Sequence, residues 1–233
     1  MYSVKNRISY SEVGVDQKLS VPALVNYFQD CSTFHSQDIG VGTSYLAEKK
    51  KAWLLSFWQI IIEDLPSMGD EVEIETRPYS FERFYGKRNF ALKSASGEYM
   101  VKANSIWFFF NSETGRPERP APEEIAPYGI DEALEMDYAP GKKIALPEQM
   151  EERDSFPVRK TDIDTNNHVN NGQYIRMAAE YFPEGQVREL RAEYRIAARY
   201  GETVYPKVGM DGQWTVISLD NEEGKPYAIV AVR

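Results

Sequence analysis

The sequence predicts an α+β fold made of two similar units in tandem, each a helix packed on an antiparallel sheet. Apolar residues recur at a spacing of three or four in residues 20–39 and again, over a shorter stretch, in residues 170–182. Each of these two segments is followed by four runs rich in β-branched and aromatic residues, which short turns separate. Two units of about 110 residues, similar in architecture but with little sequence identity, account for the chain length of 233 residues.

The first unit is expected to span residues 1–111. Ser20 is a candidate N-cap for the helix over residues 20–39, Pro22 fits its first turn, and Gly40 can end it. The apolar side chains expected on one face of this helix are Leu24, Tyr27, Phe28, Cys31 and Phe34. A short second helix is expected from Thr43. Strands are expected at residues 52–64, 71–83, 87–95 and 99–111.

Residues 112–153 are rich in proline and charge and are expected to form a linker that packs along the surface. The second unit is expected to span residues 154–233, with its helix over residues 170–182. A local echo pairs Asp16 and Tyr27 of the first unit with Asp164 and Tyr174 of the second. Strands are expected at residues 187–199, 203–210, 213–220 and 226–233.

The composition excludes several classes of protein. A net charge of −9 argues against a binder of nucleic acid or of an anionic membrane surface. The single cysteine, Cys31, cannot form an intramolecular disulfide, and two histidines without a CxxC pair are a poor set of metal ligands. No signal peptide is apparent, and the longest apolar run, residues 53–62, is too short to span a membrane. We therefore expect a cytoplasmic protein.

The segment DIDTNNHVNNGQYI, at the start of the second helix, resembles the signature of the fatty acyl-acyl carrier protein (acyl-ACP) thioesterases, bacterial type. Further similarity lies in SVPALVNYFQD, SIWFFFNSETGRPERP and AEYRIAARYG, so the resemblance covers nearly the whole chain. HVNN alone is shared more broadly by hotdog thioesterases, whereas DxNxHVNN at the start of a helix is more specific. The resemblance implies a double hotdog fold and hydrolysis of fatty acyl-ACP to free fatty acid.

The signature carries residue types that thioester hydrolysis needs. Asp164, Asn166 and His168 alternate, so in an extended segment their side chains would project to the same side. An imidazole, which titrates near pH ~6.5 when unperturbed, is suited to act as general base. Asp164 could orient the imidazole or the water, and Asn166 could donate to the thioester carbonyl. Backbone N–H groups at the following helix N-terminus could stabilise the oxyanion. The family resemblance assigns catalysis to the same three positions.

One departure from the family pattern lies after EYR in the second unit. Members of the family commonly carry an acidic residue there, whereas this chain has Ala197 followed by Ala198. Glu193, Glu202 or Glu180 could substitute for it. The simplest alternative for the signature is an Asx-turn and helix cap with an inert His168.

The acyl chain needs an apolar slot, and the candidates for its lining are Val21, Leu24, Val25 and Phe28. His35 and Cys31 on the same helix are expected to be structural. The reaction requires no metal or bound cofactor, because the phosphopantetheine arm arrives with the substrate.

The partner that the resemblance implies is acyl carrier protein, itself acidic, so docking needs a local basic patch. The candidate basic residues are Lys49–Lys51, Arg83, Lys87, Arg88, Lys142, Lys143, Arg188, Arg191 and Arg195. Alternative functions are an acyl-CoA thioesterase of the same fold, a non-catalytic acyl-binding or scaffolding protein, and, more weakly, a hotdog dehydratase. The sequence leaves open the chain-length preference and whether the protein is a monomer or a homodimer.

Overall fold

The computed structural model describes residues 1–233, which fall into two units by their internal contacts. The first unit comprises residues 1–56 and 60–139, and the second comprises residues 57–59 and 140–233. Both combine helices with antiparallel strands, which confirms the predicted α+β class. No helix combines the length and the apolar character that crossing a membrane requires.

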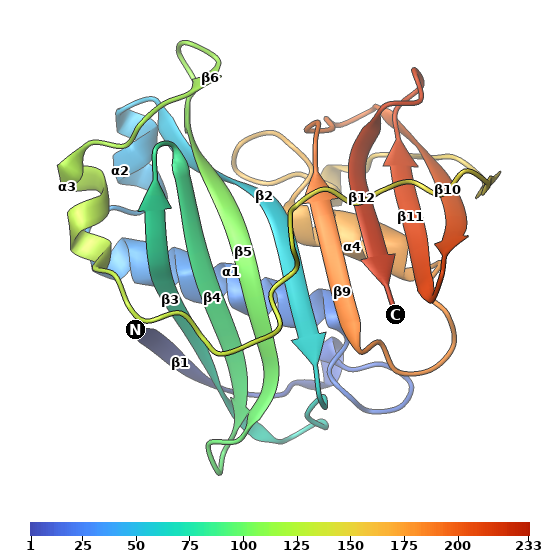
Figure 1. Cartoon of the computed structure of the whole chain (residues 1–233), viewed down its shortest axis with the longest axis horizontal. Helices are drawn as coiled ribbons and strands as arrows, with labels where there is room; N and C mark the ends of the chain where they lie inside the picture. Colours follow the sequence, from blue (N-terminus) through green and yellow to red (C-terminus); the bar gives the residue numbers. More distant parts are fainter. The chain divides into compact units, whose positions relative to one another are not determined.

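The sheet of the first unit has the strand order β1-β3-β4-β5-β2, and Figure 1 shows α1 lying behind it. The strands are β1 (Tyr2–Arg7), β2 (Lys51–Ile62), β3 (Glu71–Glu82), β4 (Tyr85–Ser94), β5 (Tyr99–Asn111) and β6 (Arg116–Pro117). The helices are η1 (Tyr10–Glu12), α1 (Val21–Asp38), α2 (Thr43–Glu48), α3 (Pro122–Ile125) and η2 (Ala126–Tyr128). The four predicted strands and both predicted helices of this unit are therefore confirmed.

Helix α1 begins as its sequence predicts. The hydroxyl of Ser20 accepts a hydrogen bond from the N–H of Ala23 at 3.4 Å, and Pro22 lies in the first turn. The predicted buried face is wrong in one position, because Phe34 is 50% exposed whereas His35 is 6% exposed. The buried stripe continues from Cys31 to His35, whose ring stacks on Tyr2 at 5.1 Å between centroids.

Strand β1 was not expected from the sequence. It pairs with β3 in antiparallel register, from Tyr2 opposite Thr76 to Arg7 opposite Glu71. Only Tyr2 and Val4 are half-buried and the other four residues are exposed, so its apolar alternation is weak. An edge strand of this kind is stabilised by its ladder and by a few contacts with α1.

The sheet of the second unit has the order β9-β12-β11-β10-β7, and β8 pairs with the first residues of β10. Helix α4 packs against β11 and β12, behind the sheet in the view of Figure 1. The elements are β7 (Met150–Glu152), β8 (Phe156–Pro157), η3 (Lys160–Asp162), α4 (Asn171–Ala179), β9 (Glu189–Tyr194), β10 (Thr203–Asp211), β11 (Trp214–Asp220) and β12 (Pro226–Val232).

The four predicted strands of the second unit are present, although β9 ends at Tyr194 rather than at residue 199. Helix α4 is shorter than predicted, because it ends at Ala179 and residues 180–182 form turns before Pro183. Its buried side chains include Tyr174, Ile175 and Ala178.

Residues 112–153 carry little regular structure, as expected, but they are anchored. Tyr128, Leu134 and Ile144 are all buried. The carboxylate of Glu193 accepts the N–H of Ile144 at 2.8 Å, and the side chain of Asn89 accepts the N–H of Leu134 at 3.0 Å. Buried side chains and hydrogen-bonded backbone N–H groups thus fix residues 112–139 to the first unit and residues 140–153 to the second.

Candidate functional site

The signature segment forms a tight turn between η3 and α4. The N–H of Asp164 donates to the carbonyl of His168 at 2.8 Å, and the N–H of Asn167 donates to the carbonyl of Asp164 at 3.1 Å. Ile163 and Val169 form an antiparallel bridge across the base of the turn, and Asn167 has a φ of 60°. The extended conformation considered from the sequence is therefore wrong, because Asp and Asn readily form turns and tolerate positive φ.

The carboxylate of Asp164 holds this turn together. Its Oδ1 accepts the N–H of Asn166 at 2.8 Å and faces the N–H of His168 at 3.4 Å. This is the geometry of an Asx-turn, in which a side chain replaces a backbone acceptor. An ionised carboxylate has about four acceptor positions, so these two contacts leave capacity for a water or an imidazole.

The turn gathers the three predicted catalytic residues on one five-residue loop. Asn166 is exposed, whereas Asp164 and His168 are half-buried. The imidazole of His168 makes no hydrogen bond or ion pair within the chain, and only the backbone N–H of this residue approaches Asp164. The structure thus presents a partly exposed imidazole on a rigid turn, where an incoming water could reach it.

Helix α4 begins two residues after the turn. Asn170 is its N-cap and accepts the N–H of Gly172 at 2.8 Å. The carbonyl of Asn171 accepts the hydroxyl of Tyr194 at 3.1 Å, which ties the first residue of the helix to β9. The first turn of a helix carries N–H groups without partners in the helix and favours nearby negative charge.

A second loop, over residues 195–202, borders the turn. The N–H of Val169 donates to the carbonyl of Ala198 at 2.9 Å, and the N–H of Ala198 donates to the hydroxyl of Tyr174 at 2.8 Å. Ala198 is fully buried, whereas Ala197 is exposed. Ala197, where the resemblance would place an acidic residue, is therefore open to solvent, and its neighbour Ala198 is hydrogen-bonded to the residue that follows the signature turn.

Two of the three carboxylates proposed as substitutes for that acid, those of Glu202 and Glu193, already have structural partners. Glu202 accepts the N–H of Arg199 at 3.0 Å and the hydroxyl of Tyr227 at 3.0 Å. Glu193 accepts from Ile144 and pairs with Arg195 at 2.9 Å. Glu180 lies at the other end of α4, after its last turn.

Tyr174, Ala198 and Tyr227 are parts of this region that sequence reasoning did not assign to the site. Tyr174 was expected on the apolar face of α4, which is correct for its ring, but its hydroxyl reaches the loop over residues 195–202. Burial raises the pKa of the hydroxyls of Tyr174 and Tyr227, so both stay protonated at neutral pH. The one signal that could have found Tyr174 is the presence of a polar tip on an otherwise apolar stripe.

The predicted acyl-lining residues lie elsewhere in the sequence, on α1. Val21 is 9% exposed, and Leu24, Val25 and Phe28 are fully buried. The ring of Phe28 lies 5.2 Å from that of Phe90 on β4. They belong to the core between α1 and the sheet of the first unit, and their contact with an acyl chain stays a prediction.

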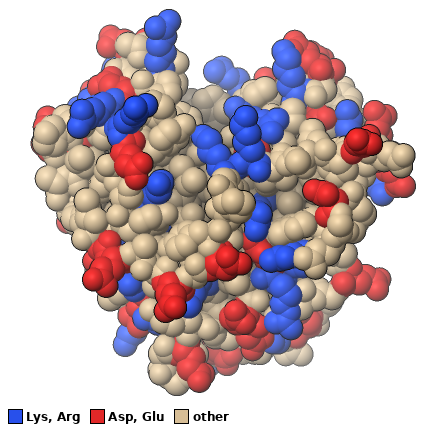
Figure 2. Space-filling model, viewed as in Figure 1, with Lys and Arg blue, Asp and Glu red and all other residues tan.

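The basic residues considered for docking of the carrier protein differ in their exposure to solvent and in their ion pairs within the chain. Arg88 is 8% exposed, so its assignment to a docking surface is wrong. Arg191 pairs with Glu189 at 2.8 Å and stacks on the ring of Trp214 at 4.6 Å. Figure 2 shows basic and acidic side chains close together over much of the face that it draws. Docking would have to use the exposed remainder of the basic side chains.

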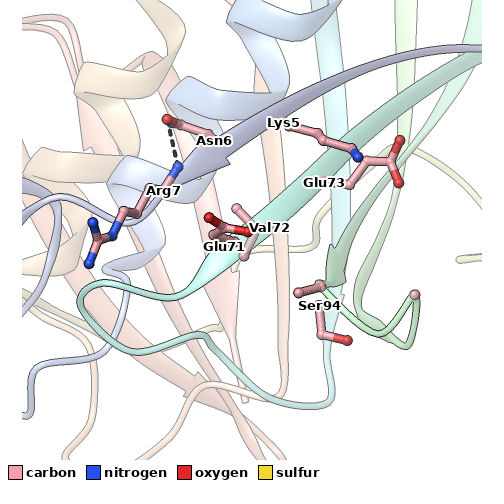
Figure 3. Close-up of a pocket in the computed structure, with 9 residues that line it drawn as sticks. Lys5, Asn6, Arg7, Glu71, Val72, Glu73 and Ser94 are labelled. Atoms are coloured by element: carbon pink, nitrogen blue, oxygen red, sulfur yellow. Dashed lines mark hydrogen bonds between the residues drawn. The ribbon is translucent and has the colours of Figure 1, made fainter.

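A hollow of about 450 Å³ lies at the ends of β1 and β3 and at the β4–β5 hairpin (Figure 3). Its walls carry both charge signs, with Lys5 and Arg7 on β1 and Glu71 and Glu73 on β3. The other residues that line it are Asn6, Val72, Ser94, Ala95 and Gly97. None of the predicted site residues lines this hollow, so it gives no support to the predicted chemistry.

Comparison with known proteins adds an independent line of argument. Residues 1–128 match the acyl-ACP thioesterase N-terminal domain, and residues 146–222 match the acyl-ACP thioesterase C-terminal domain. An acyl-[acyl-carrier-protein] hydrolase of Cuphea viscosissima, described as chloroplastic, is 28% identical over 224 residues, which cover 86% of this chain and 52% of that protein. The chloroplastic oleoyl-acyl carrier protein thioesterase 2 of Arabidopsis thaliana is 27% identical over 230 residues, 87% of this chain and 61% of that protein. The chain spans about half the length of the first of these relatives.

Solved structures share the fold. An acyl-ACP thioesterase from Bacteroides thetaiotaomicron superposes with a TM-score of 0.87 at 21% identity, over 99% of this chain and 96% of that one. The 12:0-ACP thioesterase from Umbellularia californica superposes with a TM-score of 0.85 at 21% identity, over 100% and 96% of the two chains.

Proposed function

Because the chain belongs to the acyl-ACP thioesterase family, we propose that it hydrolyses the thioester of fatty acyl-ACP to free fatty acid and the thiol of the carrier. One observation about the candidate site supports this proposal most directly. The imidazole of His168 has no partner within the chain, and it stands on a turn that Asp164 locks directly before the N-terminus of α4. A structural histidine would be expected to bond with its surroundings.

In the proposed reaction His168 is the general base. An imidazole nitrogen takes a proton from water as the water oxygen attacks the thioester carbonyl carbon. The tetrahedral intermediate then expels the carrier sulfur, and the imidazolium returns the proton to that sulfur to give the thiol. Asp164 acts mainly by fixing the backbone of the turn, and its carboxylate also stabilises the nearby imidazolium while it exists.

The oxyanion of the intermediate needs hydrogen-bond donors. The exposed amide of Asn166 and the N–H groups at the start of α4 are donors that lie close to His168 along the chain. Donors of this kind, already oriented before the reaction, stabilise charge that develops only in the transition state. No metal or bound cofactor takes part in this scheme.

The finer features follow from the same proposal. The two units form a double hotdog, with a first unit over residues 1–111, a linker over residues 112–153 and a second unit over residues 154–233. Val21, Leu24, Val25 and Phe28 line the acyl slot. The protein works in the cytoplasm as a monomer or homodimer, with acyl carrier protein as its partner and without nucleic acid or membrane.

One observation favours a second function. Ala197 leaves an exposed position beside the signature turn without a carboxylate. A non-catalytic protein that binds fatty acyl groups is the function that such a loss would favour. An acyl-CoA thioesterase is the other alternative, distinguished by its substrate rather than by its site.

The test is thiol release by the wild-type protein from acyl-ACP of several chain lengths and from the matching acyl-CoA esters. We expect a higher kcat/KM with acyl-ACP and a clear optimum of chain length. A higher kcat/KM with acyl-CoA would refute acyl-ACP as the substrate and support the acyl-CoA thioesterase alternative. Tight acyl-ACP binding without thiol release would support the non-catalytic alternative.

A further inference from the structure

The loop over residues 195–202 in the second unit has a counterpart over residues 63–70 in the first. In the first unit Leu19 donates to the carbonyl of Pro66 at 2.9 Å, and in the second Val169 donates to the carbonyl of Ala198 at 2.9 Å. Further along, the backbone N–H of Asp70 donates to the carbonyl of Ser67 at 3.1 Å. The backbone N–H of Glu202 likewise donates to the carbonyl of Arg199 at 3.1 Å.

The same loops end in the same way. The carboxylate of Asp70 accepts the N–H of Ser67 at 2.8 Å, as that of Glu202 accepts the N–H of Arg199 at 3.0 Å. Gly69 and Gly201 both have positive φ, at 90° and 85°. The two units therefore build one loop structure twice, and position 66 is equivalent to position 198.

The two loops differ at this equivalent position. Pro66 has no backbone N–H, so no hydrogen-bond acceptor is needed at this position of the loop. Ala198 has an N–H that is fully buried and must be satisfied, and the hydroxyl of Tyr174 accepts it at 2.8 Å. The residue of α1 equivalent to Tyr174 is Leu24, since the turn and helix of the second unit carry the numbers of the first plus 150. The first unit thus pairs Pro66 with the apolar Leu24. The second unit pairs the N–H of Ala198 with the hydroxyl of Tyr174.

The bond to Tyr174 stands at one end of a short chain of contacts that leads to His168. Ala198 is held by its N–H to α4 and by its carbonyl to Val169, and Val169 directly follows His168. Tyr174 is 2% exposed, so its ring cannot shift without disturbing the core. Loss of the hydroxyl would free the Ala198 peptide and, with it, Val169, the bridge residue that follows the signature turn.

We propose that Tyr174 is a positioning residue of the thioesterase site, which holds the Ala198 peptide against Val169 and so fixes the turn that carries His168. The inference rests on the proposed function, and it assigns to Tyr174 no contact with the substrate. It also explains why proline suffices in the first unit, where the equivalent turn carries Lys18 in place of the base.

The experiment compares the wild type with Tyr174→Phe, with the double variant Tyr174→Phe/Ala198→Pro, and with Tyr128→Phe. Tyr128 is a matched control in the first unit, because its hydroxyl is also buried and donates to the hydroxyl of Ser36 at 2.9 Å. The readouts are melting temperature, kcat and KM for acyl-ACP, and hydrogen exchange of peptides that cover residues 165–170 and 195–202.

We expect Tyr174→Phe to lower kcat on the order of 10- to 100-fold with little change in KM, because misplacement of a base slows the chemical step. Exchange in both loops should quicken. The double variant should regain most of the lost kcat and melting temperature, because proline removes the orphaned N–H and stiffens the loop as it does at Pro66. Tyr128→Phe should keep its kcat.

Unchanged kcat in folded Tyr174→Phe, with an active wild type, would overturn the positioning role and leave the proposed function standing. A loss of kcat that the double variant does not regain, although its stability and exchange return, would overturn it too, since the hydroxyl would then act without Ala198. No thiol release by the wild type would refute the proposed function, and the inference with it.

Discussion

The turn over residues 14–18 in the first unit and the turn over residues 164–168 in the second have the same backbone. Gly14 donates to the carbonyl of Lys18 at 2.9 Å, as Asp164 does to that of His168 at 2.8 Å. Gln17 and Asn167 have φ values of 63° and 60°. In each unit a short 3-10 helix precedes the turn, and the main helix follows two residues after it.

The side chains on the two turns differ completely in chemistry. Lys18 occupies the position of His168, and its ammonium pairs with Asp64. A lysine is protonated at neutral pH and cannot accept a proton from water. The difference teaches that both units of this chain start the main helix with the same backbone turn, whatever side chains the turn carries.

The comparison also corrects an expectation from the sequence. The echo that pairs Asp16 with Asp164 is wrong, because Gly14 is the backbone equivalent of Asp164. Tyr174 is equivalent to Leu24 rather than to Tyr27. Two aspartates at similar distances from two tyrosines arose in different positions of the same turn.

Replacing residues 164–168 by the sequence GVDQK of residues 14–18 should have the largest effect on activity. The backbone should be kept, because the same sequence already forms this turn in the first unit. Acyl-ACP hydrolysis should fall by roughly 10²- to 10⁴-fold, the usual contribution of a general base. Circular dichroism and thiol release would test this together, and a folded variant with wild-type activity would show that the signature turn is not the site.

Asp164→Asn and Asp164→Gly should separate charge from turn geometry. Asparagine keeps a neutral acceptor for the N–H groups of Asn166 and His168, whereas glycine removes it. We expect Asn to lower kcat by about 10-fold or more with little loss of stability, through the lost charge next to an imidazolium. Glycine should in addition lower the free energy of unfolding by about 1 kcal/mol.

Urea unfolding and kcat measured on the same preparations would test this pair. Equal stability of the two variants would contradict the role of the Asp164 carboxylate in holding the turn.

Ala197→Glu should raise kcat by about 3- to 10-fold, because an exposed carboxylate beside the turn can help to polarise the water. The matched control is Leu65→Glu at the equivalent place in the first unit. Leu65 is 9% exposed, so that control should lose stability without gaining activity. A lower kcat in well-folded Ala197→Glu would mean that this position does not face the reacting water.

His35 is buried on α1, whereas His168 is half-buried on the signature turn. The smallest effect that we expect concerns His35. Burial and the adjacent Arg88 lower the pKa of His35 from 6.5 to about 4. Between these pH values the unfolded chain binds a proton that the folded chain does not, so stability falls as the pH is lowered through that window. Above pH 6.5 this histidine contributes nothing to the pH dependence.

His35→Gln should therefore lose less stability than the wild type from pH 6.5 to 4, by roughly 1–3 kcal/mol. Tyr2, Tyr128, Asp38 and Asp131 also lie close to His35, but they are common to both proteins. Urea unfolding at several pH values would measure the difference, and parallel pH curves for the two proteins would contradict the prediction.

The sequence predicted the elements with strong periodicity and missed those that depend on distant partners. Helix α1 and strands β2 to β5 are clear because their apolar spacing is sustained and their turns carry Gly, Pro and Asp. Strand β1 was missed because most of its residues are polar and its ladder with β3 comes from residues about 70 positions later.

The candidate site was predicted in composition but not in conformation. The Asx-turn alternative correctly describes how Asp164 is used, and the same turn leaves His168 half-buried, so the role of this histidine as base stays a prediction. The contact between Tyr174 and Ala198 could not be predicted, because it depends on how the loop after β9 folds back on α4.

The most direct test of the account is to measure acyl-ACP thiol release by His168→Ala and Lys18→Ala side by side, both confirmed to be folded. The account predicts that His168→Ala loses roughly 10²- to 10⁴-fold in kcat. Lys18→Ala should keep the rate of the wild type, because its turn has the same backbone but no base. Equal rates in the two variants would contradict the claim that the second turn alone carries the reaction.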